Sequence, residues 1–354
     1  MSITKVFEGK TEYVQILDKD GKVDKKLEPK ISADVLMSMY RHMVLLRAWD
    51  KKCLALQRTG RMYTYAPAEG QEAIVVGSGL ALGAQDWIFP TYRESYLYYI
   101  RGASLDSINL AWMGYEDGLK VDPKLHAFPV AIPIATQYAH ATGAGYALKL
   151  KKIDGAAVAY GGDGSTSEGD FHDALNFAGV LESPCVFIVS NNQWAISTPR
   201  KWQTKSDTIA QKALAYGLKG IQADGNDILA VHSLVREALE NARAGKGSTL
   251  LEFITYRMGP HTTADDPKKY RGEEEVTYWR ERDPIKRFQK YLADKGIWNE
   301  TFEKEVTESA VKIVEESVEK AEAFKADRTE IFKHALGFMT KDLEEQMKEC
   351  FEGQ

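Results

Sequence analysis

Cysteine is scarce in this chain. Its 354 residues include three, Cys53, Cys185 and Cys350, which are too few and too scattered for a disulfide framework, and no two of them form a CxxC pair. The cysteine content therefore excludes a secreted protein that is stabilised by several disulfides, and it excludes a zinc site built from cysteine pairs. A reducing compartment fits this cysteine usage, and we expect a cytoplasmic protein.

Long apolar runs and an excess of basic charge are also missing. A membrane-spanning helix needs about 20 consecutive apolar residues, and no run approaches that length. The first residues, MSITKVFEGKTEYVQIL, contain no continuous apolar core of the kind that a signal peptide has. The net charge of -5 and the isoelectric point near 5.9 provide no electrostatic footprint for nucleic acid. We expect an unexported, soluble protein with neither a membrane nor nucleic acid as a partner.

What the chain does have is an alternation of apolar runs and helical patterns, within an ordinary globular composition of 44% hydrophobic and 27% charged residues. A helical pattern comes first, from Ala33 to near Gly60. The apolar runs of strand length are 86–89, 156–160, 186–189 and 250–254. Strands that alternate with helices predict an α/β fold, with a mostly parallel sheet and helices on both faces.

Composition divides the chain into three parts. The first residues are polar with glycine and proline breakers, which predicts a loose arm or a small edge hairpin. After Asp283-Pro284 the residues are mainly Glu, Lys and Ala with helical spacing, and their charge runs should form solvated faces. The predicted parts are an N-terminal arm (1–30), an α/β domain (31–283) and a C-terminal helical extension (284–354).

The most informative motif is Gly161-Gly162-Asp163-Gly164-Ser165, followed after a helix-sized gap and a second apolar run by Asn191-Asn192. Asp163 and Asn192 each come at the carboxyl end of an expected strand, where open parallel sheets bind ligands. Their oxygens suit Mg²⁺ when phosphate completes its octahedron, and the glycines let backbone amides approach phosphate. The motif predicts a metal-diphosphate site; an ordinary glycine-rich turn beside an asparagine-rich strand exit is the alternative.

A helix is expected directly after this motif. Ser165 and Glu168 have the spacing of a capping box, and Phe171, Ala174 and Leu175 continue a helical pattern. The positive end of the helix dipole would then face the phosphates.

These segments carry a resemblance to a known family. GDGSTSEGDFHDALNFAG and NNQWAISTP resemble the thiamin diphosphate fingerprint of the 2-oxo-acid dehydrogenases, and more narrowly that of the alpha subunit of their decarboxylating first component. RMYTYAPAEGQEA, FPTYRES, IPIATQ and YRMGPHTTADDPKKYR follow the family order. Among members, the chain is most similar to the pyruvate dehydrogenase alpha subunits of bacteria. The resemblance implies the thiamin diphosphate-binding fold, with thiamin diphosphate and Mg²⁺ as cofactors.

The resemblance also implies roles for residues around the cofactor. Asp163 and Asn192 match the metal ligands of the family, and Trp194 matches the position whose main-chain carbonyl completes them. Tyr92 and Arg93 match a pair at the diphosphate, with Gly164 and Ser165 beside it. Ile134 matches the apolar residue that holds the cofactor in its bent form. The carbonyl of Ile132 matches one that contacts the aminopyrimidine of the cofactor.

Substrate contacts are implied at three further positions. His261 lies in a Gly-, Pro- and Asp-rich segment, so we expect a loop; it matches the catalytic histidine near the cofactor phosphate and the substrate. Tyr63 and Tyr65 would line the substrate entrance, although packing in the core or rim is an equal interpretation. Thr262 aligns with a site that is phosphorylated in mitochondrial relatives.

The sequence departs from the family pattern at two places. Ala66 stands where mitochondrial pyruvate enzymes have a histidine. Some relatives have a second active-site histidine within the segment 114–129, where His126 of this chain is displaced, so that role stays unassigned.

The activity that the resemblance implies is the decarboxylation of pyruvate and the reductive acetylation of lipoyl groups on a dihydrolipoyl acyltransferase core. A branched-chain 2-oxo acid is the alternative substrate. In this family a separate beta subunit supplies the glutamate that starts the chemistry, so we expect an alpha2beta2 heterotetramer. Two competing hypotheses are a nicotinamide-dependent dehydrogenase, for which a clean GxGxxG is missing, and a catalytically silent assembly subunit.

Overall fold

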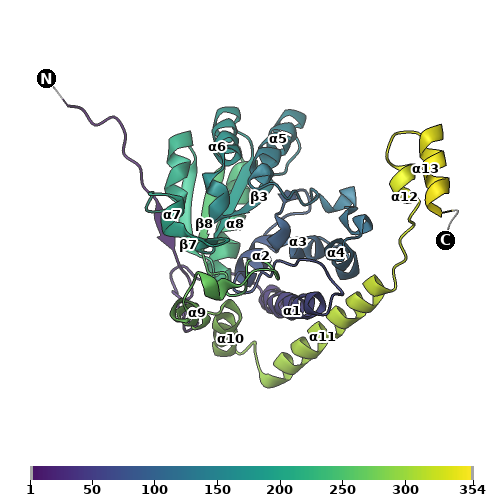
Figure 1. The fold of residues 1–354 in the computed structure, drawn as a ribbon. Coiled ribbons are helices and arrows are strands. Elements are labelled where there is room, and N and C mark those ends of the chain that lie inside the picture. The colour runs from purple at the N-terminus through teal and green to yellow at the C-terminus, as the bar shows by residue number, and fades with distance from the viewer. Residues whose placement is uncertain (1–2, 352–354) are drawn as a thin grey trace.

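A computed structural model describes residues 3–351. Its central element is one six-stranded, fully parallel sheet in the order β1-β7-β8-β4-β3-β2. Helices cover both faces of this sheet (Figure 1), so the predicted α/β fold is confirmed. The strands are β1 (Glu12–Val14), β2 (Trp87–Phe89), β3 (Ala157–Gly162), β4 (Cys185–Asn191), β7 (Lys219–Asp224) and β8 (Thr249–Ile254), with a separate antiparallel ribbon of β5 (Trp194–Ala195) and β6 (Thr198–Pro199).

Successive side chains of the central strands point to opposite faces and fill two separate cores. Val158 and Val186 belong to one core, whereas their neighbours Ala159 and Phe187 belong to the other. The first core lies under α2 (Glu72–Gly79) and α8 (Ile228–Arg243), and the second lies under α5 (Thr136–Lys151) and α6 (Gly169–Leu181). Burial on both faces explains why these strands are nearly continuous apolar runs in the sequence.

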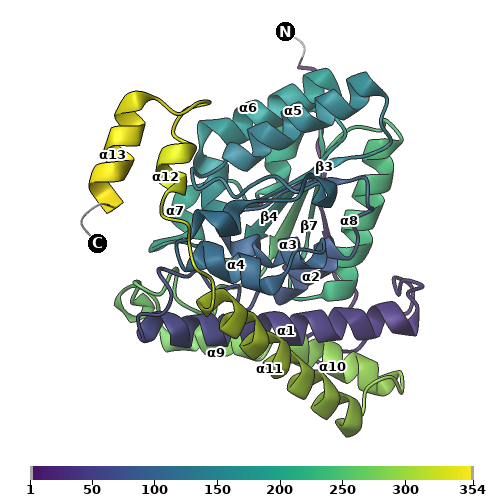
Figure 2. The same cartoon turned by 90° about the vertical axis from the view of Figure 1, so that its right-hand side faces the viewer.

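The first face carries a further layer. Helix α1 (Ala33–Arg58) crosses outside α2, and α11 (Glu300–Glu322) packs along α1 and α4 (Leu105–Trp112), as Figure 2 shows. Val306, Val314 and Val318 of α11 belong to the same core as the strands. The remaining α-helices are α3 (Tyr96–Ile100), α7 (Arg200–Gln203), α9 (Glu273–Arg280), α10 (Pro284–Asp294), α12 (Glu330–Lys333) and α13 (Lys341–Phe351).

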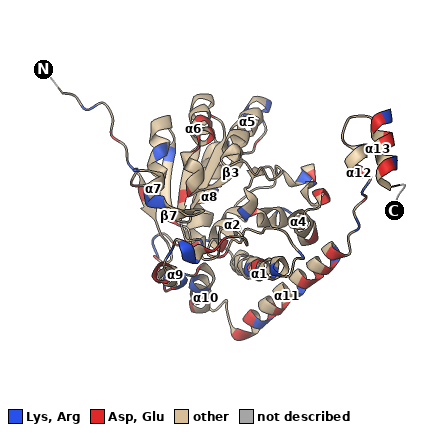
Figure 3. Ribbon diagram, in the orientation of Figure 1, with Lys and Arg blue, Asp and Glu red and all other residues tan. Residues whose placement is uncertain are grey.

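The predicted C-terminal helices are present. Asp283 caps α10 by accepting from the amides of Ile285 and Lys286, and Pro284 occupies the first helical position, where a missing amide hydrogen has no cost. Both signs of charge alternate along α11 and α13 (Figure 3), as expected for solvated faces. None of the helices within residues 3–351 combines the length and the hydropathy that crossing a membrane requires.

Two strands of the central sheet, β1 and β7, were not predicted, and neither was the β5-β6 ribbon. β1 lies in the predicted arm and pairs in parallel with β7 at the edge of the sheet, with Glu12 opposite Ile221. The arm is also held by buried hydrogen bonds, because the amides of Ile16 and Leu17 both donate to Asp227 Oδ2 at 2.6 Å. A three-residue strand whose partner lies some two hundred residues later has no local signal of its own. The division into arm, domain and extension stays a prediction.

Candidate cofactor site

A cleft opens at the carboxyl ends of β3 and β4. The two strands are neighbours and Gly162 pairs with Ser190, so the residues that follow them, Asp163 and Asn192, come out side by side. The cleft encloses a cavity of 280 Å³. The predicted residues that line it are Tyr92, Arg93, Ile134, Asp163, Gly164, Ser165, Asn192, Trp194 and His261.

Asp163 is 1% exposed, and its carboxylate is held in place. Oδ2 accepts a hydrogen bond from Gln203 Nε2 at 2.6 Å. Burial raises the pKa of Asp163, and the hydrogen bonds from Gln203 and from main-chain amides oppose that rise. A buried carboxylate with no ammonium or guanidinium partner within the described residues is a site that a divalent cation would stabilise.

The turn after β4 carries the other two expected ligands. Gln193 has φ of +74°, and this left-handed residue reverses the chain between Asn192 and Trp194. Asn192 Nδ2 donates to Gln71 Oε1 at 3.2 Å, which fixes the orientation of its amide, and Oδ1 accepts from the amide of Trp194 at 3.3 Å. The Trp194 carbonyl accepts from Arg257 Nη1 at 3.1 Å, which leaves its second lone pair for a metal.

The two glycines at the exit of β3 have different surroundings. A Cβ at Gly162 would meet nothing nearer than the Ser190 carbonyl at 4.0 Å, so this backbone faces open space in the cleft. A Cβ at Gly164 would lie 2.6 Å from the Cβ of Ala195, so glycine is required there by close packing. Gly162 is therefore the position at which a phosphate could approach the backbone.

The predicted capping box is wrong. A 3-10 turn, η4 (Asp163–Ser167), intervenes, and α6 begins only at Gly169 without any side-chain cap. Ser165 Oγ instead donates to the Gly162 carbonyl at 2.5 Å and lies 3.1 Å from the Tyr138 hydroxyl. Ser165 therefore stabilises the turn that carries Asp163, and the start of α6 does not follow Gly164 directly.

One buried guanidinium group, that of Arg93, lines the cleft, and a second, that of Arg257, contacts the lining residues Trp194 and His261. Arg93 donates to the carbonyls of Pro67 at 2.5 Å and His261 at 3.0 Å. Arg257, which is 0% exposed, donates to the carbonyl of Ile196 at 2.7 Å as well as to that of Trp194. Within residues 3–351 neither one forms an ion pair with a carboxylate, and burial together with Arg93 lowers the pKa of Arg257 to about 10. Positive charge in the cleft and directly next to it can therefore be neutralised by a bound anion.

His261 lies in a loop, as predicted, between the two guanidinium groups. Its Nδ1 is 3.3 Å from Arg93 Nη2 and 3.3 Å from Arg257 Nη1, and its main-chain amide donates to Asp265 Oδ2 at 2.8 Å. Burial, followed by the charges of Arg93 and Arg257, lowers the pKa of His261 to about 4. The imidazole is thus neutral at pH 7. Because both neighbours can only donate, Nδ1 must accept and Nε2 carries the proton.

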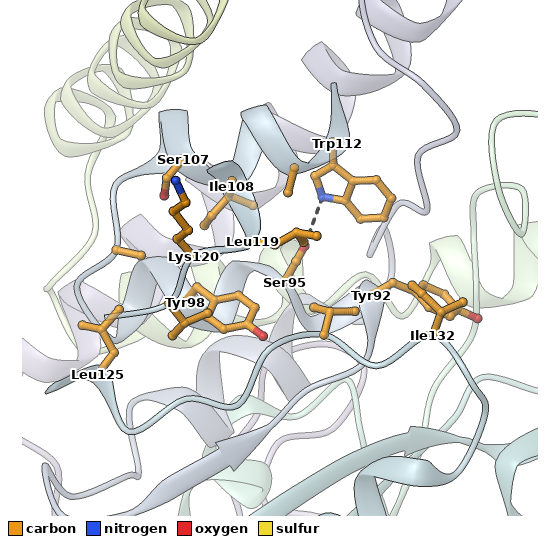
Figure 4. Close-up of a pocket in the computed structure, with 15 residues that line it drawn as sticks. Tyr92, Ser95, Tyr98, Ser107, Ile108, Trp112, Leu119, Lys120, Leu125 and Ile132 are labelled. Atoms are coloured by element: carbon orange, nitrogen blue, oxygen red, sulfur yellow. Dashed lines mark hydrogen bonds between the residues drawn. The ribbon is translucent and has the colours of Figure 1, made fainter. Parts of the chain in front are cut away.

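Ile132 does not line this cleft. It is 65% exposed and borders a neighbouring apolar recess of 140 Å³, which shares Tyr92 with the cleft. Figure 4 shows Tyr92 and Ile132 at one side of this recess, with Trp112 Nε1 directed at Ser95 Oγ. Residues 118–121 and 125, which belong to the segment 114–129, form part of the wall of this recess.

The two predicted substrate tyrosines also lie away from the cleft. Tyr63 is 70% exposed and borders a separate hollow on the surface. Tyr65 is buried, and its hydroxyl donates to Asp50 Oδ1 at 2.5 Å. Its main chain pairs with Thr263, whose amide donates to the Tyr65 carbonyl at 2.9 Å. Tyr65 therefore holds the loop that contains His261 through its main-chain hydrogen bond to Thr263.

The buried Asp50 beneath Tyr65 leads to a prediction about stability. Burial raises the pKa of Asp50 from 3.8 to about 8, and Oδ2 has no hydrogen-bond partner among the described residues. Because the folded pKa is the higher one, this carboxyl stabilises the fold fully below about pH 4, and that contribution is lost as the pH rises through 8. Asp50→Asn cannot ionise and keeps the acceptor for Tyr65. We expect its unfolding midpoint to exceed that of the wild type by on the order of 5 °C at pH 8.

Thermal unfolding at pH 5, 7 and 9 checks this expectation. The difference between Asp50→Asn and the wild type should grow from pH 5 to about 8 and stay constant above that. Asp34→Asn, on the exposed surface of the same helix, is the matched control. A difference that is the same at every pH would contradict the prediction.

Three residues that hold predicted site residues in place were not themselves predicted, and of these only Gln71 lines the cleft. Gln71 and Arg257 lie within segments that resemble the family, but no pattern indicated that Gln71 orients Asn192 or that Arg257 is buried. No sequence pattern predicted the contact of Gln203 with Asp163, because the two residues are forty positions apart in the chain.

Comparison with known proteins agrees with this geometry. Residues 40–330 match the model of the family described as the dehydrogenase E1 component. A relative from Mycobacterium tuberculosis, named 3-methyl-2-oxobutanoate dehydrogenase subunit alpha, is 43% identical over 96% of this chain and 93% of its own length. The pyruvate dehydrogenase E1 component subunit alpha of Acholeplasma laidlawii is 43% identical over 94% of this chain and 97% of its own length. The protein of that same name from Staphylococcus aureus is 40% identical over 98% of this chain and 93% of its own length.

The chain therefore belongs to the dehydrogenase E1 component family, whose members use thiamin diphosphate. Within this family it is the alpha subunit of a 2-oxo-acid dehydrogenase, as the resemblance predicted. Such alpha subunits generally work with a beta subunit and an acyltransferase core. The relatives are named for different 2-oxo acids, so the comparison does not determine which 2-oxo acid is the substrate of this chain.

Proposed function

We propose that this chain is the alpha subunit of a thiamin diphosphate- and Mg²⁺-dependent pyruvate dehydrogenase of the acetyl-transferring type. It decarboxylates pyruvate and acetylates the lipoyl groups of a dihydrolipoyl acyltransferase core, together with a beta subunit in a cytoplasmic alpha2beta2 heterotetramer. The observation that carries the proposal is one cleft that is lined by Asp163, Asn192 and the buried Arg93, with the buried Arg257 in contact with the lining residue His261.

The ligand set supports Mg²⁺ shared with a diphosphate. Within residues 3–351 no group of three or more His, Cys, Asp or Glu side chains could hold a metal ion. A cation at Asp163 would therefore rely on the amide oxygen of Asn192, the carbonyl of Trp194 and phosphate oxygens. Mg²⁺ prefers such a mixture of few protein oxygens with phosphate and water.

The remaining residues have roles that follow from their positions. Thiamin diphosphate, when bound, supplies the group that stabilises the carbanion left by decarboxylation. Arg93 would donate to the diphosphate with Tyr92 beside it, while Gly164 and Ser165 shape the turn. Ile134, which lines the cleft and is 46% exposed, would pack against the bound cofactor.

His261 is the catalytic residue in this proposal. With a pKa near 4 the imidazole stays neutral at pH 7, so Nε2–H acts as a hydrogen-bond donor to the substrate or to the cofactor phosphate. Ile132, Tyr63 and Tyr65 belong to the proposal only through the resemblance, because none of them borders the cleft of the isolated chain.

Pyruvate is favoured by two of the relatives and by the overall resemblance. The relative from M. tuberculosis supports a second candidate, a branched-chain 2-oxo acid. The two substrates differ by a few methyl and methylene groups. A pocket distinguishes such a difference by about 1–3 kcal/mol, or roughly 10- to 200-fold.

Comparing substrates in the assembled complex tests this proposal. The chain is co-expressed with its beta subunit, and the decarboxylation of pyruvate, 2-oxobutyrate and 3-methyl-2-oxobutanoate is measured with and without thiamin diphosphate and Mg²⁺. We expect activity only when both cofactors are present, with kcat/KM at least about tenfold higher for pyruvate. A higher kcat/KM for 3-methyl-2-oxobutanoate would select the branched-chain candidate, and NAD-dependent turnover of a hydroxy acid would overturn both.

A further inference from the structure

A side chain outside the predicted set holds the carboxylate of Asp163. Gln203 is the last residue of α7, and its Nε2 donates to Asp163 Oδ2 at 2.6 Å and to the Thr198 carbonyl at 3.1 Å. The main-chain carbonyl of Gln203 accepts from Ser167 Oγ at 3.4 Å, so α7 is tied to the η4 turn. Gln203 is therefore positioned by the same turn that carries Asp163.

The neutrality of this donor is important. A Lys or Arg side chain in place of Gln203 would also orient the carboxylate, but its charge would cancel the negative charge that attracts a divalent cation. An amide donates a hydrogen bond and leaves that charge in place. With Oδ2 of Asp163 held by Gln203, the other carboxylate oxygen is left for a ligand in the cleft.

We propose that Gln203 is a positioning residue for a divalent cation at Asp163: it fixes one carboxylate oxygen with a neutral donor and leaves the other oxygen, with its charge, to the metal. The acceptor Oε1 of Gln203 is buried and has no partner among the described residues. A water molecule in the coordination shell of Mg²⁺ would supply the missing donor. This inference rests on the proposed function, because it assumes a metal in this cleft.

Titration with Mg²⁺ tests the inference in the complex assembled with the beta subunit. Binding is followed by calorimetry in the presence of thiamin diphosphate for three variants. Gln203→Met removes the donor at nearly constant size, Gln203→Lys keeps a donor but adds a charge, and Trp202→Ala changes the exposed neighbour in α7 as a control.

We expect the Kd for Mg²⁺ to rise about tenfold in Gln203→Met, as for other hydrogen bonds to charged groups. It should rise at least as much in Gln203→Lys and stay unchanged in Trp202→Ala. At saturating Mg²⁺ the kcat of Gln203→Met should return to within about twofold of the wild type, which a merely structural defect would not allow.

Two results would overturn the inference. One is a Kd for Mg²⁺ in Gln203→Met equal to that of the wild type, and the other is full recovery of Mg²⁺ affinity in Gln203→Lys, which would show that neutrality is irrelevant. If Gln203→Met failed to assemble with the beta subunit, the Kd for Mg²⁺ of Gln203→Lys, compared with that of the wild type, would still test the inference. If the wild type itself bound thiamin diphosphate without any need for Mg²⁺, the proposed function would fail instead.

Discussion

Asp163→Ala is expected to abolish the Mg²⁺-dependent binding of thiamin diphosphate and, with it, the decarboxylation of 2-oxo acids by the assembled complex. Asp163 is the buried carboxylate at the exit of β3, where it lines the cleft, and its charge has no guanidinium or ammonium partner within the described residues. Loss of an outer partner of a metal ligand typically costs about 10- to 100-fold in affinity, and loss of the ligand itself should exceed that range. Calorimetric titration with both cofactors measures the effect.

Two further variants separate loss of the ligand from loss of structure. Asp163→Asn keeps the shape but not the charge, and it should bind Mg²⁺ nearly as poorly as Asp163→Ala. Asp173→Ala, on the exposed side of α6, should bind as the wild type does. Thermal stability without cofactors should not fall in Asp163→Asn, because that substitution removes a buried charge. Wild-type activity in Asp163→Ala would favour the hypothesis of a silent assembly subunit.

Arg257→Lys is expected to weaken the binding of thiamin diphosphate by about 100-fold, although it keeps the charge. The guanidinium group donates to the carbonyls of Trp194 and Ile196 and to the Tyr270 hydroxyl, at 3.1, 2.7 and 2.8 Å. A single ammonium group cannot span these acceptors, since only the planar fork of Arg presents several donors at fixed spacing. Each buried carbonyl left without a donor costs about 1–3 kcal/mol, so the free energy of unfolding should also fall by about 2–4 kcal/mol.

The matched control is Arg236→Lys, because Arg236 is an exposed residue of α8 that pairs with Glu240 on the same helix. It should change neither cofactor affinity nor stability. If Arg257→Lys bound the cofactor like the wild type, positive charge alone would explain the role of Arg257. The hydrogen bonds to the turn after β4 would then be irrelevant to the site.

The sequence predicted the parts of the fold whose signal is local. Runs such as 156–160 are apolar because both faces of the strand are covered, and the helix after Ala33 ends where its pattern ends. β1 was missed because it is short, polar and paired with a distant strand. The start of α6 was misplaced because Ser165 and Glu168 have capping-box spacing, whereas a 3-10 turn uses the Ser165 hydroxyl for its own main chain.

The site was predictable only where motif and topology agree. Asp163 and Asn192 could be placed together because the carboxyl ends of adjacent parallel strands meet. The roles of Gln203 and Arg257 depend on side chains that reach across the fold, and no local pattern encodes such contacts. Tyr65 shows the converse: the family order of its segment is present, but its hydroxyl lies in the core against Asp50.

The most direct test of this account is an experimental density map of the chain assembled with its beta subunit, thiamin diphosphate and Mg²⁺. We expect one metal ion within about 2.0–2.1 Å of oxygens from Asp163, Asn192 and the Trp194 carbonyl, and of diphosphate oxygens. Gln203 should still hold the second carboxylate oxygen, and Arg93 should face the phosphates. A map with the cofactor bound while Asp163 and Asn192 point away from any ion would contradict the account.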